Sequence, residues 1–238
     1  MNNKPILFEV NNNIAVITLN RPERRNSINQ ELLSQLYNSI DEIINNNEIK
    51  VGVITGNGKS FCSGIDLDCL ATDNLFNPRG DGLDMLDVFA KCKKPIIGAI
   101  NGHAITGGFE IALNCDFLIA SETASFADTH AIVGIHPGWG MTQLLQAAVG
   151  QRMAKQMSFT GEFISAEKAL KLGLVNEVLP DNKTLIFRAM QLASEICAVK
   201  QDIMLVVKDL IEYRNSAGFY ESMQNEKKGF DRFLKNFN

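Results

Sequence analysis

The chain has 238 residues, of which 45% are hydrophobic, and its 23 basic and 27 acidic side chains give a formal net charge of −4. This composition is typical of a globular protein that buries a sizeable core, and it lacks the basic excess usual in nucleic-acid-binding proteins. Because no apolar run approaches the roughly 18 residues of a membrane span, we expect neither a nucleic-acid partner nor a membrane partner.

The first part of the chain predicts a hairpin, a helix and a strand. Two β-branched runs, Ile6–Val10 and Ile14–Leu19, are separated by three asparagines, which tolerate the positive φ of a tight turn. Gln30–Ile44 carries apolar residues at helical spacing, and the apolar run Val51–Thr55 is typical of a buried strand.

Strands and helices alternate in the middle of the chain. The polar segment Ala71–Asp81 predicts a loop, and Leu83–Ala90 has the spacing of a helix. Two further buried strands, Pro95–Ile100 and Asp116–Ala120, flank a helix predicted over Thr106–Leu113. This alternation favours parallel strands joined by crossover helices, the pattern of an α/β fold.

The C-terminal part is predominantly helical, with its clearest patterns at Leu205–Tyr213 and Phe219–Phe237. Such apolar helix faces usually need a partner surface. We therefore predict an α/β core over residues 1–190 and a helical region over residues 191–238.

The five cysteines are scattered and odd in number. Because they form no CxxC spacing and have no paired histidines beside them, the sequence predicts neither a disulfide framework nor a metal site. The N-terminus resembles neither a signal peptide nor a transit peptide. We therefore expect reduced thiols and a cytoplasmic location.

Two glycine-containing segments predict a site where backbone N–H groups meet a ligand. Phe61–Leu67 follows a strand and a Gly-rich turn, and Gly107 and Gly108 stand where a helix should begin. Glu110 lies one turn further among apolar residues, where a carboxylate is costly unless it is paired or used. Together these groups are what an oxyanion site with an acid/base requires. The alternatives are a tight turn capped by Asp66 and a Glu110 exposed to solvent.

A third polar segment, Phe126–Gly140, contains His130 and Trp139. His130 is a candidate acid/base, but the alternative is a structural histidine that hydrogen-bonds within its loop through Asp128 or Thr129. We interpret Trp139, which lies among glycines, as a packing residue.

These segments, in this order, resemble the crotonase superfamily, the enoyl-CoA hydratase/isomerase family, over nearly the whole chain. The resemblance implies a spiral of ββα units followed by a C-terminal helical region that builds homotrimers or dimers of trimers. The matching segments are Leu19–Ser27 for the early CoA-contacting turn, Ser60–Leu67 and Lys94–Asp116 for the two oxyanion segments, and Ser165–Val178 for the part after the core.

The resemblance also implies a ligand, which is an acyl-CoA thioester. The backbone N–H groups of Ile65 and Gly107 would hold the thioester oxygen, and Arg24, preferred to Arg25, would meet the CoA phosphates. No metal and no separate cofactor are implied, because CoA is part of the substrate. The other implied contacts of CoA or its acyl tail are Ser63, Gly64, Asp66, Leu67 and Phe233.

Glu110 matches the first catalytic glutamate of the hydratases, and His130 stands where they have a second one. A histidine, with an unperturbed pKa of about 6.5, can donate the second proton. The resemblance therefore predicts an enoyl-CoA hydratase-like lyase that adds water across the 2,3 double bond. Two alternatives stay open, namely another crotonase reaction such as isomerisation, decarboxylation or cleavage, and a weakly active or non-catalytic acyl-CoA-binding protein.

Overall fold

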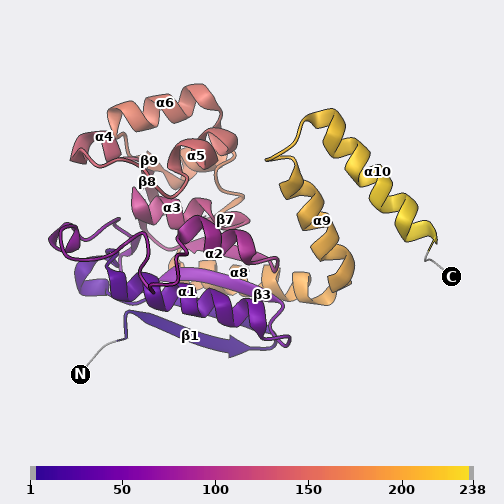
Figure 1. The fold of residues 1–238 in the computed structure, drawn as a ribbon. Coiled ribbons are helices and arrows are strands. Elements are labelled where there is room, and N and C mark those ends of the chain that lie inside the picture. The colour runs from indigo at the N-terminus through magenta and orange to yellow at the C-terminus, as the bar shows by residue number, and fades with distance from the viewer. Residues whose placement is uncertain (1–3, 236–238) are drawn as a thin grey trace. The chain divides into compact units, whose positions relative to one another are not determined.

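The computed structural model describes residues 4–235 and contains a six-stranded sheet in the order β1-β2-β3-β5-β7-β10 (Figure 1). β1 and β2 form the predicted antiparallel hairpin, and Asn12 and Asn13 turn the chain with φ angles of 50° and 67°. All other neighbours in this sheet are parallel. The strands are β1 (Ile6–Asn11), β2 (Ile14–Leu19), β3 (Val51–Gly56), β5 (Ile96–Ile100), β7 (Phe117–Ser121) and β10 (Glu177–Leu179).

A second, smaller sheet has the order β4-β6-β8-β9. β4, β6 and β8 are parallel, and β9 joins β8 in the antiparallel direction. The sequence analysis did not predict these strands, because two or three residues are too few to show a periodic pattern. They are β4 (Ser60–Cys62), β6 (His103–Ile105), β8 (Ser125–Ala127) and β9 (Ile164–Ser165).

The helices follow the predicted patterns closely in the first half of the chain. α2 begins at Met85 because Asp84 caps it: the Asp84 side chain accepts a hydrogen bond from Asp87 N, and the Asp87 side chain accepts one from Asp84 N. The helices up to residue 198 are α1 (Gln30–Asn45), α2 (Met85–Lys91), α3 (Gly107–Leu113), α4 (His130–Val133), α5 (Met141–Val149), α6 (Gln151–Thr160), α7 (Ala166–Lys171) and α8 (Asn182–Ala198), with 3-10 helices at Pro22–Arg24 and Leu67–Cys69.

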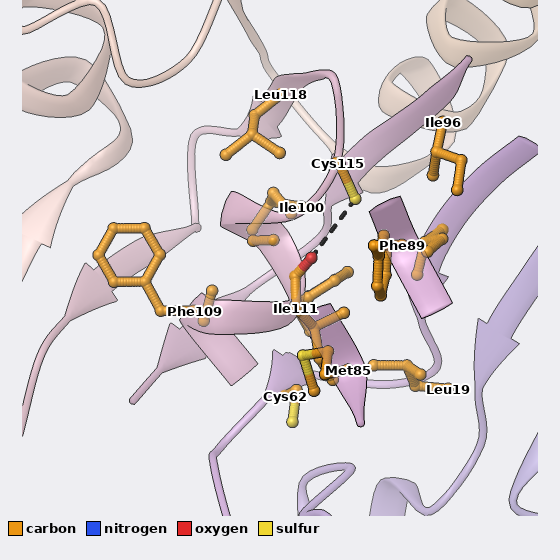
Figure 2. Packing of buried hydrophobic residues seen from close by; sticks show 14 of the residues in the cluster. Leu19, Cys62, Met85, Phe89, Ile96, Ile100, Phe109, Ile111, Cys115 and Leu118 are labelled. Atoms are coloured by element: carbon orange, nitrogen blue, oxygen red, sulfur yellow. Dashed lines mark hydrogen bonds between the residues drawn. The ribbon is translucent and has the colours of Figure 1, made fainter. Parts of the chain in front are cut away.

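Helices cover both faces of the large sheet. Alternate residues of its strands, such as Val51, Val53 and Ile97, pack against Leu185 and Ala189 of α8. The opposite face belongs to the larger core cluster, to which α1, α2 and α3 contribute. Figure 2 shows part of this cluster around Ile111 of α3 and Met85 of α2. The predicted α/β class is confirmed.

The chain alternates between the two sheets in a repeated order. A strand of the large sheet is followed by a strand of the small one, as β5 by β6 and β7 by β8, and then by a helix. Since β4, β6 and β8 are adjacent and parallel, their carboxyl ends lie at one edge of the small sheet. The segments after these three strands are therefore brought together.

The first compact unit extends to Cys197, and the rest of the chain forms a separate one. This second unit contains α9 (Gln201–Tyr213) and α10 (Phe219–Lys235), so the end of the predicted helix at Phe237 lies outside the described residues. The Tyr213 hydroxyl donates a hydrogen bond to Glu221, which links the two helices. Among the helices of residues 4–235, none has the length and apolar character to cross a membrane.

Candidate active site

The carboxyl edge of β4, β6 and β8 brings the predicted catalytic residues together. Ile65 follows β4, Gly107 directly begins the helix after β6, and His130 begins the helix after β8. A Cβ atom on Gly107 would lie 3.5 Å from Ile65 Cγ1 and 3.3 Å from the Trp139 ring. Ile65, Gly107 and His130 thus share one site, although 42 residues separate the first two and 23 the last two along the chain.

The two predicted oxyanion donors are the backbone N–H groups of Ile65 and Gly107. Gly64 O accepts a hydrogen bond from Ile28 N, and Asp66 N donates one to Ile28 O, each at 2.8 Å. Because successive peptide groups of an extended segment point to opposite sides, the N–H of Ile65 points away from Ile28. Within residues 4–235, neither the Ile65 nor the Gly107 N–H donates a backbone hydrogen bond.

Thr106 holds the second donor in place through an unusual backbone conformation. Its φ of 50° and ψ of −112° lie outside the ordinary regions for a β-branched residue. Thr106 N donates to Ala127 O at 2.9 Å, Thr129 N donates to Thr106 Oγ1 at 3.2 Å, and the two threonine hydroxyls hydrogen-bond to each other. The start of α3 is therefore fastened to the segment that carries His130.

Glu110 is buried, with 1% of its surface exposed, which excludes the alternative of a solvent-exposed glutamate. Its Oε1 accepts hydrogen bonds from Trp139 N at 2.9 Å and Met141 N at 3.2 Å. Burial raises the pKa of Glu110 above the ordinary value, although both hydrogen bonds and the nearby His130 oppose this shift. A carboxyl with a raised pKa exchanges protons closer to neutral pH, as an acid/base requires.

Trp139 is a packing residue, as expected, but its backbone N–H has a second role that the sequence analysis missed. The indole is 1% exposed and lies 5.5 Å from the ring of Phe76. Gly140, with a φ of 100°, turns the chain so that the N–H groups on both sides of it meet Glu110. Because every residue except proline carries such a donor, only the neighbouring Gly-rich turn could have signalled it.

His130 lies between two carboxylates. Its Nδ1 is 2.7 Å from Asp128 Oδ1, and its Nε2 is 3.8 Å from Glu110 Oε2. All three side chains are buried. Burial opposes ionisation of Asp128, but hydrogen bonds from His130 and Ser158 outweigh it and hold the pKa of Asp128 below the ordinary value. The hydrogen bond to Asp128 expected for a structural histidine is present, and so is the proximity to Glu110 expected for a proton carrier.

The residues predicted to contact CoA around Gly64 differ in their surroundings. Gly64 has a φ of 94°, and a Cβ on it would lie 3.0 Å from Ile105 O, so glycine is required there. The Asp66 carboxylate is already engaged by Arg21 at 3.0 Å and by Ser27 Oγ at 3.2 Å. Leu67 is 57% exposed and available for contact. The Ser63 N–H donates to Arg25 O at 3.1 Å, which joins this segment to the early turn.

The two arginines of the turn at Leu19–Ser27, Arg24 and Arg25, have different surroundings. Arg24 forms an exposed ion pair with Asp68 at 3.3 Å. Arg25, whose φ is 53°, lines a surface hollow of about 610 Å³ together with Lys59 and His103. The hollow thus gathers three basic side chains. Its other lining residues are Pro22, Glu23, Gly58 and Ser60.

Two further predictions concern groups away from this edge of the sheet. Phe233 belongs to the separate C-terminal unit, so its contact with the substrate tail stays a prediction. In the part of the chain from residue 4 to residue 235, no cluster of three or more histidine, cysteine, aspartate or glutamate side chains has an arrangement that could hold a metal ion.

Comparisons with known proteins agree with the resemblance seen in the sequence. Residues 9–236 match the enoyl-CoA hydratase/isomerase family. A probable peroxisomal enoyl-CoA hydratase 1 of Arabidopsis thaliana is 40% identical over 203 residues, which cover 83% of this chain and 74% of the relative. A short-chain-enoyl-CoA hydratase of Clostridium acetobutylicum is 39% identical over 195 residues, covering 80% and 74%. The crystal structure of an enoyl-CoA hydratase from Mycobacterium marinum superposes with a TM-score of 0.89 at 28% identity, covering 98% of this chain and 91% of that one.

The raised pKa of Glu110 predicts that Glu110→Gln stabilises the protein at alkaline pH. The folded protein binds the Glu110 proton more tightly than the unfolded chain, so the contribution of this group to stability is lost as pH rises through the folded pKa. Glutamine keeps the acceptor oxygen for Trp139 and Met141 without the buried charge. We expect the variant to melt about 2–4 °C higher at about pH 8, equivalent to about 1 kcal/mol, and the difference to shrink towards about pH 4. A lower melting temperature at about pH 8 would contradict this account.

Proposed function

The chain belongs to the enoyl-CoA hydratase/isomerase family, and from that premise we propose that it is an enoyl-CoA hydratase-like lyase. The reaction adds water across the 2,3 double bond of an enoyl-CoA thioester. The observation that carries the proposal is the buried Glu110 carboxylate, which two backbone N–H groups orient beside both Gly107 and His130. The names of the relatives, all enoyl-CoA hydratases, support the same reaction.

In this mechanism the N–H groups of Ile65 and Gly107 bind the thioester oxygen. Addition of water at C3 places negative charge on that oxygen in an enolate-like state. Fixed donors stabilise this charge without reorganising, and losing one such donor typically costs about 3–4 kcal/mol. The assignment is supported by the hydrogen bonds of Gly64, Asp66 and Thr106. These bonds leave the N–H groups of Ile65 and Gly107 available for the thioester oxygen.

Glu110 takes the proton of the attacking water, and His130 is the second proton carrier, which delivers a proton to C2. The two side chains face each other across 3.8 Å, so both reach one small volume. An imidazole in place of a second carboxylate can carry a proton because each of its ring nitrogens can bind one.

The replacement of a carboxylate by His130 keeps a second function open. An isomerisation, decarboxylation or cleavage of an acyl-CoA, or acyl-CoA binding without efficient turnover, would need the oxyanion donors but not two carboxyls. Hydration assays across short to long enoyl-CoAs, run beside isomerisation assays, separate these activities. If none of these substrates is hydrated, the result favours the second function.

For CoA binding we propose the basic hollow at Arg25, Lys59 and His103 as the place of the phosphates, in preference to Arg24. Arg25 and Lys59 place two cations against the single carboxylate of Glu23 around this hollow, and His103 lies beside them, whereas the one charge of Arg24 is paired with Asp68. CoA is part of the substrate, and the proposed chemistry uses no other cofactor.

We further propose that the protein assembles as a homotrimer or a dimer of trimers in the cytoplasm. Within their own unit, α9 and α10 have no fully buried residue, and large apolar side chains on them are more than 40% exposed. A pair of helices with such faces needs a partner surface to be stable. The exposed side chains include Val206, Val207, Ile211, Phe219, Tyr220, Met223, Phe230 and Phe233.

Glu110→Gln is expected to reduce hydration while leaving CoA affinity nearly unchanged. The substitution removes the base but keeps the volume and the acceptor oxygen, so turnover should fall by about 10²–10⁴-fold. The measurements are kcat on a short enoyl-CoA and the dissociation constant of CoA. Glu122→Gln, at an exposed turn, is the matched control and should keep full activity. Full activity of Glu110→Gln with every convertible acyl-CoA would refute the assignment.

Arg25→Ala and Lys59→Ala are each expected to raise KM about three- to tenfold with little change in kcat, since each removes a cation worth about 0.6–1.4 kcal/mol. Arg24→Ala is the matched control and should change KM less. The effect should weaken at high salt and with a substrate that lacks the 3′-phosphate. If Arg24→Ala has the largest effect, the hollow is not the phosphate site.

The proposed assembly predicts a particle of three or six chains at micromolar concentration. Light scattering coupled to size exclusion measures the mass directly. Ile211→Glu, which places a charge on an exposed apolar position of α9, should shift the mass towards that of one chain. A wild-type mass of one chain at this concentration would reject the trimer.

A further inference from the structure

Asp128 is a buried carboxylate to which the family resemblance assigned no function. It is 2% exposed, and its Oδ1 lies 2.7 Å from His130 Nδ1 and accepts a hydrogen bond from His130 N at 3.2 Å. Ser158 of α6 hydrogen-bonds to the same carboxylate. A buried carboxylate with these partners remains ionised, and an ionised carboxylate can only accept hydrogen bonds.

The proton on the imidazole follows from this contact. Because Asp128 accepts, Nδ1 of His130 must donate, and so it keeps its proton. The other nitrogen, Nε2, is therefore the atom that gains and loses a proton, and it is the one that faces Glu110 Oε2. The ionisable groups that face His130 are Asp128 from its own segment and Glu110 from α3, while α6 contributes the neutral Ser158.

We propose that Asp128 is a positioning residue that fixes His130 with a proton on Nδ1, so that Nε2 serves as the proton donor opposite Glu110. The Asp128–His130 pair then replaces the second carboxyl of the hydratases as the proton donor. This inference rests on the proposed hydration for its catalytic part, but the tautomer it assigns can be measured without any turnover.

The protons balance over one cycle. Water gives a proton to Glu110 as its oxygen bonds to C3, the π electrons of the double bond pass to the enolate, and C2 takes the proton from His130 Nε2. Glu110 is then protonated, and His130 is neutral with its proton on Nδ1. Transfer of the proton from Glu110 Oε2 to His130 Nε2, across the 3.8 Å that separates them, restores both groups. One water has been added in total.

The same geometry predicts that positions 128 and 130 depend on each other. A glutamate at position 130 would put a second buried carboxyl next to Asp128, and two carboxyls at hydrogen-bond distance share one proton between them. That proton is then held by Asp128, so His130→Glu alone should deliver it poorly to C2. Asp128→Asn removes the competing carboxyl, so the double variant should recover activity that the single His130→Glu variant lacks.

The tautomer is tested by NMR on the whole protein with ¹⁵N-labelled histidine. The chain has three histidines, and the His130 signals are assigned by their loss in His130→Gln. We expect Nδ1–H on His130 when it is neutral, and in Asp128→Asn a mixture of the two tautomers, because an amide can either accept from Nδ1 or donate to it. His103 and His136, which contact Ser125 and Pro137 instead, are internal controls, and their tautomers should not change. A proton on Nε2 of neutral His130, or an unchanged tautomer in Asp128→Asn, would overturn the proposal.

Kinetics with crotonyl-CoA as the probe then test the catalytic part. In Asp128→Asn we expect kcat at about pH 7.5 to drop about 10–100-fold, with KM nearly unchanged. The Asp128→Asn/His130→Glu variant should be at least about tenfold more active than His130→Glu. An unchanged kcat in Asp128→Asn, or no recovery in the double variant, would reject the catalytic part. A wild-type protein that hydrates no enoyl-CoA, yet shows the assigned tautomer, would reject the proposed function but not the pair.

Discussion

Parallel pairing of the short strands β4, β6 and β8 is the constraint on which the site depends. Strands of three residues do not stand alone in water, and each of these continues a path that leaves the large sheet. Because these strands are parallel, their three carboxyl ends lie at one edge of the small sheet. That edge collects Ile65, Gly107 and His130 from segments that are far apart in the sequence. The hydrogen bonds between Thr106 and Thr129 then join two of these segments directly.

A buried glutamate would normally weaken a fold, and here the surroundings offset only part of that cost. Two backbone N–H groups satisfy one oxygen of Glu110, while the second oxygen faces His130 beyond ordinary hydrogen-bond distance. The first oxygen is thus held in place, and the second keeps its proton affinity. This division is what an acid/base needs, and burial keeps the pKa of Glu110 raised despite the hydrogen bonds.

The exchange of a carboxylate for an imidazole changes more than one position. His130 brings a second ring nitrogen into a buried site, and that nitrogen requires its own partner. Asp128 supplies the partner, and Ser158 in turn hydrogen-bonds to Asp128. The proton carrier that we propose is consequently a hydrogen-bonded network of His130, Asp128 and Ser158 rather than one side chain. If position 130 alone were compared with the hydratases, the histidine there would be described as the loss of a catalytic group.

The sequence by itself determined the local elements and the chemical types in the site. Asn12 and Asn13 predicted the hairpin because they tolerate positive φ, the apolar spacing predicted α1 and α2, and the glycines before Glu110 predicted backbone donors beside a carboxylate. Only the tertiary structure decided that Trp139 N hydrogen-bonds to Glu110, that Asp128 contacts His130 Nδ1, and that Arg25 rather than Arg24 lines the basic hollow. The reason is physical: a backbone N–H is common to nearly every residue, strands of three residues show no periodicity, and the direction of a side chain is set by contacts between distant segments.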